Sequence, residues 1–451
     1  MASVATASVL AARPAAGQAQ TRAASASRVL GANDRIRLGY IGCGMQFHVL
    51  LSRGFEPRRK GLDDFDYVAV CDVWQPRLDY AKKQTGAEAT YRDYRELLSR
   101  DDIDGVVIVV PDHLHYRIAR EALLAGKDVY LEKPMTYTID EAESLHAIVN
   151  ETGRMLQVGG SGVNAPLHWK VNEYLKGGHM GKVLWGLISY NRNTDEGMWD
   201  YPIPGVGDEA WPDAPVTADN LDWDMWLGPA KKRRFSKERY FRWRKYWDYS
   251  GGNATDLLFH RLGAMSAMIG FDFPTRVTGA GGIYVQKNRE VPDTYMTVVE
   301  YPGEYCVNMV SCMANETSAP ITVYGNWGTL EIVPAARPAA GSPRPTGNRD
   351  GTAVIRPERQ FLKQFQEANG GKTEVTLRAE ERAEDLVDNW MNAMRSRKTP
   401  IYDVLKGYQV TVAIQLGVQS YREGRTLAFD PVRRKVLGRP PARREYLPKD
   451  A

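Results

Sequence analysis

The chain has 451 residues, of which 43% are hydrophobic and 25% are charged. This is the composition of an ordinary globular protein, and it excludes general disorder. Lysine and arginine total 59 against 55 acidic residues, so the net charge of +4 gives no electrostatic footprint for nucleic acid. No stretch approaches the run of about 18 apolar residues that a conventional membrane-spanning helix needs.

The length predicts two domains, because compact domains usually contain about 100 to 200 residues. We place the first domain at 34–160 and the second at 161–435, with a C-terminal tail at 436–451. Residues 1–33 are rich in alanine and serine and carry few charges, so we expect a leader or a disordered tail there.

Short apolar runs alternate with helical segments throughout the first domain. The run at 105–110 is apolar on both faces, as expected where helices cover both sides of a parallel sheet. The first domain is therefore predicted to be α/β. Its expected strands are 36–42, 67–71, 105–110, 128–131 and 155–158, and its expected helices are 45–53, 76–84, 117–125 and 140–152.

Beyond residue 182 the alternation gives way to long β-like segments. They predict an α+β domain with a mostly antiparallel sheet. A surface loop rich in proline and glycine precedes two final helices. The expected strands are 183–191, 276–285, 294–301, 304–313 and 320–333, the loop is 334–351, and the helices are 379–396 and 403–423.

The sequence indicates neither a disulfide framework nor a metal centre. It contains no cysteine–histidine cluster with zinc spacing, and His113 and His115 have no third ligand near them in the sequence. We expect four buried, unpaired thiols, at Cys43, Cys71, Cys306 and Cys312.

A glycine turn follows the first strand. Gly42 and Gly44 allow the backbone to approach a pyrophosphate at the start of the next helix, although Phe47 stands where a third glycine is usual. Asp72 ends the second strand, where an acidic side chain accepts hydrogen bonds from a ribose and repels a 2′-phosphate. NAD is therefore favoured over NADP, while Arg77, which could reach a phosphate, keeps NADP open.

Further polar residues follow two later strands, at the sheet edge where open α/β sheets bind their ligands. Lys133 would face the nicotinamide there and stabilise the alkoxide that precedes hydride transfer. The alternative is a solvated lysine before a turn proline. The predicted cofactor-binding residues are Gly42, Gly44, Met45, Gln46, Asp72, Pro111, Asp112, His115, Glu132 and Lys133.

Asp256 and His260 are spaced as i and i+4 after the pair Gly251-Gly252. On a helix that begins after these glycines, both side chains lie on one face. Such a pair can orient a hydroxyl and move its proton, because histidine titrates near neutral pH. The alternative is a capping aspartate and a core histidine. We predict Lys133, Asp256 and His260 as the catalytic residues.

Seven of the 11 tryptophans lie between residues 185 and 247, interspersed with arginines and tyrosines. Aromatic faces beside polar groups suit sugar rings, so a carbohydrate substrate is expected. The basic and aromatic stretch 231–245 could also suit nucleic acid, but one stretch in a near-neutral chain gives little support. The predicted substrate-binding residues are Lys133, Arg192, Trp199, Arg242, Tyr246, Asp256 and His260.

The motif Glu132-Lys133-Pro134 and the pattern Gly-Gly-x-x-x-Asp-x-x-x-His at 251–260 resemble those of the Gfo/Idh/MocA oxidoreductases. The resemblance covers 34–435. It implies a Rossmann domain, a second domain with a large open sheet, and dimers or tetramers formed through that sheet. It also implies that Lys133, Asp256 and His260 surround the nicotinamide and the substrate carbon.

Members of this family mostly oxidise or reduce sugars and cyclitols, and some are exported with the cofactor bound. The segment 25–31 resembles the end of a twin-arginine export signal, although the arginine pair is missing. Both a periplasmic and a cytoplasmic location in a bacterium therefore stay open.

We expect an NAD-dependent oxidoreductase that acts on a hydroxyl of a sugar, glycoside or cyclitol. An alternative within the same family is a redox-neutral glycoside hydrolase, in which tightly bound NAD is reduced and then reoxidised within one cycle. The third hypothesis is a non-catalytic NAD-binding sensor. We expect neither nucleic acid nor a membrane as a partner.

Overall fold

The computed structural model describes residues 35–201, 203, 216–335, 351–381, 383–438 and 440. The expected leader 1–33, most of the loop 334–351, most of the tail 436–451 and Trp211 lie outside this part of the chain. Within the described residues, no helix is both long enough and apolar enough to span a bilayer.

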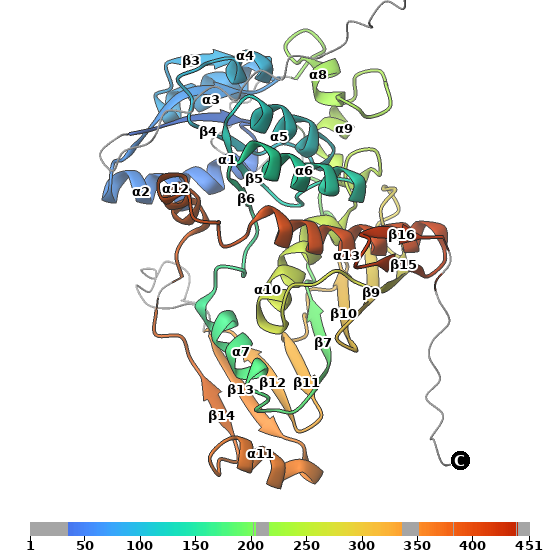
Figure 1. Ribbon diagram of the computed structural model, residues 1–451. Coiled ribbons are helices and arrows are strands. Elements are labelled where there is room, and N and C mark those ends of the chain that lie inside the picture. Colours follow the sequence, from blue (N-terminus) through green and yellow to red (C-terminus); the bar gives the residue numbers. More distant parts are fainter. Residues whose placement is uncertain are drawn as a thin grey trace, which may run out of the picture.

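The first sheet has six parallel strands in the order β3-β2-β1-β4-β5-β6, with helices on both faces (Figure 1). Every residue of the inner strand β4 is buried, which confirms the predicted α/β fold. The strands are β1 (Ile36–Ile41), β2 (Phe65–Cys71), β3 (Ala89–Tyr91), β4 (Gly105–Ile108), β5 (Asp128–Leu131) and β6 (Leu156–Val158). The helices are α1 (Met45–Leu50), α2 (Glu56–Gly61), α3 (Gln75–Thr85), α4 (Tyr94–Leu98), α5 (His115–Leu124) and α6 (Ile139–Thr152).

The helix after the glycine turn is longer than predicted. The prediction ended at residue 53, but a π-helical turn at Leu51–Phe55 carries the chain on into α2. Phe47, at the position of the missing third glycine, is fully buried and packs edge-on against Tyr40, with ring centroids 4.8 Å apart. Ring packing thus replaces the close backbone approach that a glycine would permit.

The second sheet has ten strands in the order β14-β13-β12-β11-β7-β10-β9-β8-β15-β16. Its strands pair antiparallel except for β7 and β10, which confirms the predicted mostly antiparallel sheet. The segment 320–333, predicted as one strand, is a hairpin that turns at Asn326 and Trp327. The strands are β7 (Val183–Ser189), β8 (Arg276–Gly282), β9 (Thr294–Tyr301), β10 (Tyr305–Cys312), β11 (Thr322–Gly325), β12 (Gly328–Val333), β13 (Thr352–Pro357), β14 (Val375–Leu377), β15 (Leu427–Asp430) and β16 (Lys435–Leu437).

One long helix, α13, lies between the two sheets (Figure 1). It packs on β8 of the second sheet and on α6 of the first domain, and buried residues occur on almost every side of it. Asp403 caps its start by accepting the backbone N–H of Lys406, and Gly424 ends it in the left-handed conformation. The remaining helices here are α7 (Pro166–Lys176), α10 (Phe259–Ile269), α11 (Leu362–Ala368), α12 (Leu386–Ser396) and α13 (Val404–Glu423).

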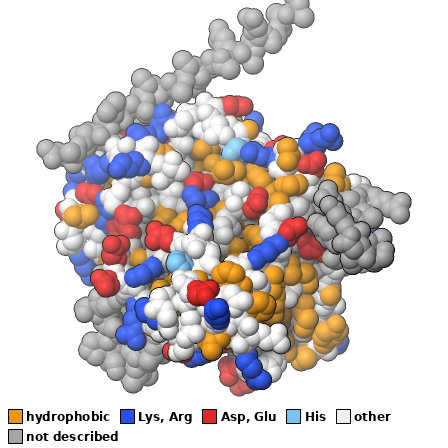
Figure 2. Space-filling view, turned by 60° about the horizontal axis from the view of Figure 1, so that its bottom comes forward, with side chains coloured by type: hydrophobic (Ala, Val, Ile, Leu, Met, Phe, Trp, Pro, Cys, Tyr) orange, Lys and Arg blue, Asp and Glu red, His pale blue; other side chains and the backbone are white. Residues whose placement is uncertain are grey.

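The face of the second sheet opposite its buried side carries apolar residues in the open. Along β9, Tyr295, Thr297 and Val299 are buried, whereas Met296 and Val298 are 48% and 40% exposed. Figure 2 shows hydrophobic side chains gathered over part of the surface. Such a patch is typical of an interaction surface.

The chain between β7 and α10 forms a separate small core against the first domain. Trp74, beyond the end of β2, forms a β-bridge with Leu221 and packs with Trp226, Tyr240 and Tyr249. We call residues 216–249 the cover segment. It contains the short helices α8 (Trp223–Leu227) and α9 (Lys237–Phe241), which Figure 1 shows beside the first sheet.

No disulfide joins the four cysteines, all of which lie in the part of the chain that the structure describes. Cys43 and Cys71 are buried, but Cys306 and Cys312 are partly exposed because their strand alternates between the two faces of the sheet.

Candidate active site

A large cavity lies between the carboxyl ends of the first sheet and the cover segment. At one end it is lined by Gly44, Asp72 and Arg77, and at the other by Lys133 and Asp256. We call these the adenosine end and the reacting end. Other predicted cofactor residues that line it are Gly42, Met45, Gln46, Pro111, Asp112 and Glu132.

The glycine turn has no room for a side chain at its first position. Gly42 has a φ of 91°, and a Cβ atom there would lie 2.3 Å from the carbonyl oxygen of Val109. At Gly44 the nearest atom to such a Cβ is 3.6 Å away, on Arg77. Gly42 is therefore required by the fold, whereas the absence of a side chain at Gly44 leaves the start of α1 open to the cavity.

Asp72 holds the glycine turn. Its buried carboxylate accepts the backbone N–H groups of Cys43, at 2.7 Å, and Trp74, at 2.9 Å. Burial raises the pKa of Asp72, while Arg77 and these backbone bonds oppose the rise. Each oxygen retains a lone pair, so the predicted hydrogen bond to a ribose stays a prediction.

Arg77 is held by aromatic rings of the cover segment and of Trp74. Its guanidinium donates to the hydroxyl of Tyr240 at 2.9 Å and lies 5.0 Å from that ring's centroid. The distance to the centroid of Trp74 is 5.5 Å. These contacts tie the adenosine end to the cover segment.

Glu132 positions the turn that carries Lys133. One carboxylate oxygen accepts Gln46 Nε2 at 3.0 Å, and the other accepts the backbone N–H of Lys133 at 3.1 Å. A Cβ at Gly159 would lie 2.9 Å from the carboxyl carbon of Glu132, so the neighbouring strand end must be glycine. The predicted residue Glu132 thus acts through Lys133, and the peptide bond between Lys133 and Pro134 is cis.

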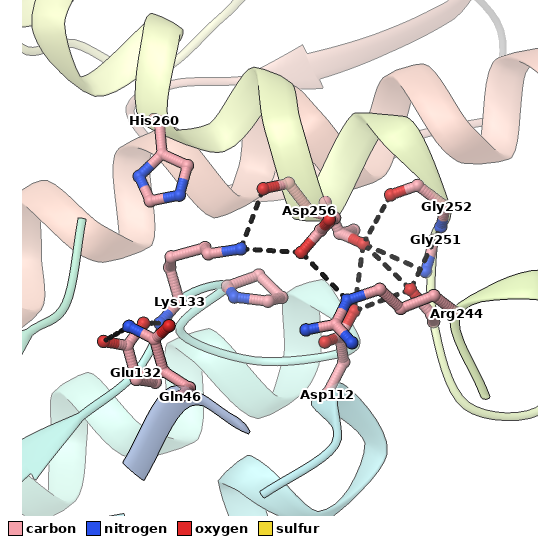
Figure 3. Close-up of polar contacts among 12 residues, drawn as sticks. Gln46, Asp112, Glu132, Lys133, Arg244, Gly251, Gly252, Asp256 and His260 are labelled. Carbon is pink, nitrogen blue, oxygen red and sulfur yellow. Dashed lines mark hydrogen bonds and ion pairs between the residues drawn. The ribbon is translucent and has the colours of Figure 1, made fainter. Parts of the chain in front are cut away.

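Lys133 and Asp256 meet at the reacting end (Figure 3). Lys133 Nζ donates to the Asp256 carboxylate and to its backbone carbonyl, both at 2.8 Å. Arg244 Nε donates to the same carboxylate oxygen at 3.1 Å. Burial alone would raise the pKa of Asp256, but Lys133 and Arg244 hold it well below its usual range. Asp256 is therefore an anion shared by two cations.

The helix that carries Asp256 differs from the prediction. Residues Ala254–Leu258 form a π-helical turn, and α10 begins only at Phe259. π-turns inside helices are frequent at functional sites, and this one lies where the Asp256 carbonyl receives Lys133. Its start is tightly packed, because Gly252 has a φ of 65° and a Cβ there would lie 2.8 Å from Val291.

His260 points toward Lys133 in Figure 3. Its Nδ1 accepts the backbone N–H of Ser161 at 2.9 Å, so the neutral ring carries its proton on Nε2. Burial and the neighbouring Lys133 lower the pKa of His260 to about 3. The predicted titration near neutral pH is thus not what this environment produces, and His260 is a neutral hydrogen-bond donor at pH 7.

Asp112 links the two halves of the site. Its Oδ2 accepts the hydroxyls of Ser250, at 3.0 Å, and Thr255, at 2.9 Å, which flank the Gly251-Gly252 pair. Burial raises the pKa of Asp112 to about 6, against the opposing effect of Lys133. A carboxyl group that titrates this close to neutral pH is suited to proton transfer.

The two candidate metal-pair histidines serve the backbone instead. His115 does not line the cavity; its ring nitrogens face the carbonyl oxygens of Pro134, at 2.6 Å, and Val110, at 2.8 Å. His113 Nε2 faces the carbonyl of Trp226 at 3.0 Å. Among the described residues, no group of three or more His, Cys, Asp or Glu side chains could hold a metal ion.

Of the predicted substrate-binding residues, Lys133 and Asp256 line the cavity, whereas Arg192 and His260 are not among its lining residues. Trp199 is 2% exposed within a small core, Arg242 contacts Asp200 and Glu238, and the Tyr246 hydroxyl also reaches Glu238. None of these three lines the cavity. Arg192 lies near His260, whose pKa it lowers. The cavity is lined instead by Tyr201, Trp243 and Arg244, which were not among the predicted site residues.

The residues present fit a dinucleotide. The open turn at Gly44, the acidic Asp72 and the cationic reacting end follow one another along a single cavity. A Rossmann sheet with a cavity of this kind at its carboxyl edge is typical of proteins that bind a nicotinamide dinucleotide. Residues 36–160 match the oxidoreductase family with an NAD-binding Rossmann fold, and 225–429 match the C-terminal alpha/beta domain of the same family. The chain belongs to the Gfo/Idh/MocA family, as its motifs predicted.

Curated relatives have different activities. Inositol 2-dehydrogenase/D-chiro-inositol 3-dehydrogenase of Lactiplantibacillus plantarum is 29% identical over 172 residues, which are 37% of this chain and 46% of that protein. Glycosyl hydrolase family 109 protein 2 of Shewanella sp. strain ANA-3 is 27% identical over 282 residues, which are 54% of this chain and 59% of that protein. These matches span about half the length of each relative.

A solved structure matches over most of the chain. The WlbA dehydrogenase of Chromobacterium violaceum, in complex with NADH and UDP-GlcNAcA, has a TM-score of 0.61 at 17% identity. The match covers 89% of this chain and 97% of that one. At this identity the likeness establishes the fold.

Proposed function

We propose that this protein oxidises or reduces a CH–OH group of a sugar, glycoside or cyclitol by hydride transfer with NAD. The observation that carries the proposal is the Lys133–Asp256 ion pair, which joins the two domains at the reacting end of the cavity. The inositol dehydrogenase relative and the sugar nucleotide bound to WlbA support a polyhydroxylated substrate.

NAD, when bound, would supply the hydride acceptor. Lys133 Nζ has three N–H groups, and two of them donate to the carboxylate and the carbonyl of Asp256. The third N–H group can donate to the hydroxyl oxygen of the substrate. It would stabilise the alkoxide as the proton leaves. His260 would donate a hydrogen bond to the substrate through Nε2–H. Asp112, with a pKa of about 6, would accept the proton that leaves the substrate hydroxyl.

The test is a panel of sugars and cyclitols supplied with NAD, with the formation of NADH as the readout. Substrate-dependent NADH that disappears in Lys133→Ala is the expected result. Turnover that is unchanged in Lys133→Ala and His260→Ala would remove the catalytic assignment. If the protein binds NAD and turns over no member of the panel, the result would instead support the hypothesis of a non-catalytic NAD-binding sensor.

A second candidate is redox-neutral glycoside cleavage. The family 109 relative favours it, because that match covers 54% of this chain against 37% for the inositol dehydrogenase. The cover segment, which packs over the adenosine end, also suits a cofactor that stays bound through the cycle. Release of the aglycone from a chromogenic glycoside without net NADH would support this candidate, and steady NADH formation would exclude it.

We also propose a homo-oligomer formed through the exposed face of the second sheet. Met296 and Val298 of β9 give this face an apolar character. Light scattering after size exclusion should give the mass of a dimer or tetramer, and Met296→Glu should lower it. A monomeric mass for the unmodified protein would contradict the proposal.

A further inference from the structure

The ring of Tyr190 packs with two arginines near His260, next to the residues that line the cavity but not among them. The guanidinium carbon of Arg192 lies 4.9 Å from the Tyr190 ring centroid, and that of Arg261 lies 4.8 Å from it. Arg192 Nη2 also donates to the Tyr190 hydroxyl at 2.7 Å. Arg192 follows strand β7, whereas Arg261 is on α10 immediately after His260, so the fold brings the pair together from two elements.

Neither arginine forms an ion pair with a described acidic residue. Most cations at the site are paired, since Lys133 and Arg244 both contact Asp256. Within the part of the chain that the structure describes, no carboxylate lies within 4.0 Å of Arg192 or Arg261. Arg261 Nε is buried and has no hydrogen-bond partner there. A buried N–H group without a hydrogen-bond partner is costly, and an oxyanion of a ligand would supply the missing acceptor.

The surplus of positive charge extends across the reacting end. Besides burial, which is the largest cause, Lys133, Arg261 and Arg192 lower the pKa of His260, whereas Asp256 raises it. Asp256 is already shared with Arg244. The carboxyl group of Asp112 carries its charge only above a pH of about 6. A site with this balance attracts an anion.

We infer that Arg192 and Arg261 bind an oxyanion group of the substrate, a carboxylate or a phosphate, close to the carbon that is oxidised. The inference rests on the proposed function and names its substrate class, an acidic sugar or cyclitol. A guanidinium is planar and offers paired N–H donors that match an oxyanion, and stacking on Tyr190 fixes its orientation before the ligand arrives. Arg192 uses one donor on Tyr190 and keeps the others for the ligand.

The experiment compares substrates that differ in one group. Glucose, glucuronate and glucose 6-phosphate carry a hydroxyl, a carboxylate and a phosphate at the same ring position, and analogous sets can be made from other sugars. We expect one of the two acids to exceed the neutral sugar in kcat/KM by roughly 10–100-fold, the value of a charged hydrogen-bond pair. Which acid is preferred tells a carboxylate site from a phosphate site.

Variants then locate the effect. Arg192→Gln and Arg261→Gln should each raise KM for the acid by roughly 10-fold or more, with little change for the neutral sugar. The conservative variant Arg261→Lys should recover part of the loss. Arg434→Gln removes another arginine that lies over a ring, at 5.3 Å from Phe273, and serves as the matched control with unchanged kinetics. Melting curves establish that each variant is folded.

The outcomes separate the two proposals. Neutral sugars turned over as well as acids, or arginine variants that affect both equally, would overturn the oxyanion site while leaving the oxidoreductase intact. If no sugar is turned over and the acids bind with equal affinity to the unmodified protein and to both glutamine variants, the oxyanion site and the proposed function fail together. If the acids bind, lose affinity in both glutamine variants and are not turned over, the oxyanion site would stand and only the proposed oxidoreductase activity would be wrong.

Discussion

The two ends of the cavity are built in different ways. At the adenosine end the side chain of Asp72 accepts the backbone N–H groups of Cys43 and Trp74, and so holds the glycine turn in place. At the reacting end side chains bind one another across the domains, as Lys133 does with Asp256. The glycine turn held by Asp72 is formed within one β-α-β unit. The Lys133–Asp256 ion pair forms only when both domains have folded.

The largest effect is expected at the reacting end. Lys133→Ala removes the N–H donor to the substrate and leaves Asp256 paired with Arg244 alone. We expect kcat to fall by roughly 10²–10⁴-fold. NAD affinity, measured by fluorescence titration, should change little because the turn at Gly44 is untouched. A loss of NAD binding as large as the loss of turnover would mean that the two ends are not independent.

The next effect breaks the adenosine end alone. Gly42→Ala would force a side chain against the carbonyl of Val109 at a φ of 91°. We expect NAD binding to be lost and the free energy of unfolding to fall by about 1–3 kcal/mol. Gly44→Ala is the control, because its nearest neighbour is 3.6 Å away, so it should keep the stability of the fold. Equal destabilisation by both substitutions would contradict the assignment.

Asp112 connects activity and stability through pH. Its pKa is raised from 3.8 to about 6, so the fold favours its protonated form and loses stability as pH rises through this window. Activity should follow the ionised form and rise over the same window, falling about tenfold per unit below it. Asp112→Asn should abolish this limb of the profile and add roughly 1–3 kcal/mol of stability at pH 8. A limb that persists in the variant would assign it to another group.

The smallest effect concerns the contact between the cover segment and Arg77. Tyr240→Phe removes one hydrogen bond and keeps the ring, which predicts about 2–10-fold weaker NAD binding with kcat unchanged. Tyr246→Phe changes a hydroxyl that reaches Glu238 outside the cavity and serves as the control. Weaker substrate binding in the control would restore Tyr246 to the substrate site.

The fold of the first domain could be predicted because apolar runs and glycines report local structure. Short elements such as β3 and α4 were missed, since they carry too few residues for a periodic pattern. The hairpin within 320–333 was missed although Gly325 and Gly328 flank its turn at Asn326 and Trp327, because β-like residues continue on both sides of the turn.

Part of the site could also be predicted from local sequence signals. Lys133 stands out because it lies between an apolar strand and Pro134, and Asp256 because it follows the pair Gly251-Gly252. Composition could not tell Arg244 from Arg242, two residues apart, although one contacts Asp256 and the other contacts Asp200. Their directions are set by the short helix at Trp243–Lys245. Nor could spacing reveal that Ser161 fixes the ring of His260, since that contact joins segments distant in the chain.

Helix α13 has a mechanical consequence. A helix buried on almost every side, in contact with β8 and with α6, has no free surface along which one sheet could slide past the other. The two sheets are expected to move as one rigid body on the timescale of turnover. The distance between Lys133 and Asp256 is then fixed when the chain folds. We expect the substrate to bind a preformed site, without closure of a hinge between the domains. Amide hydrogens of α13 should accordingly exchange among the slowest in the protein.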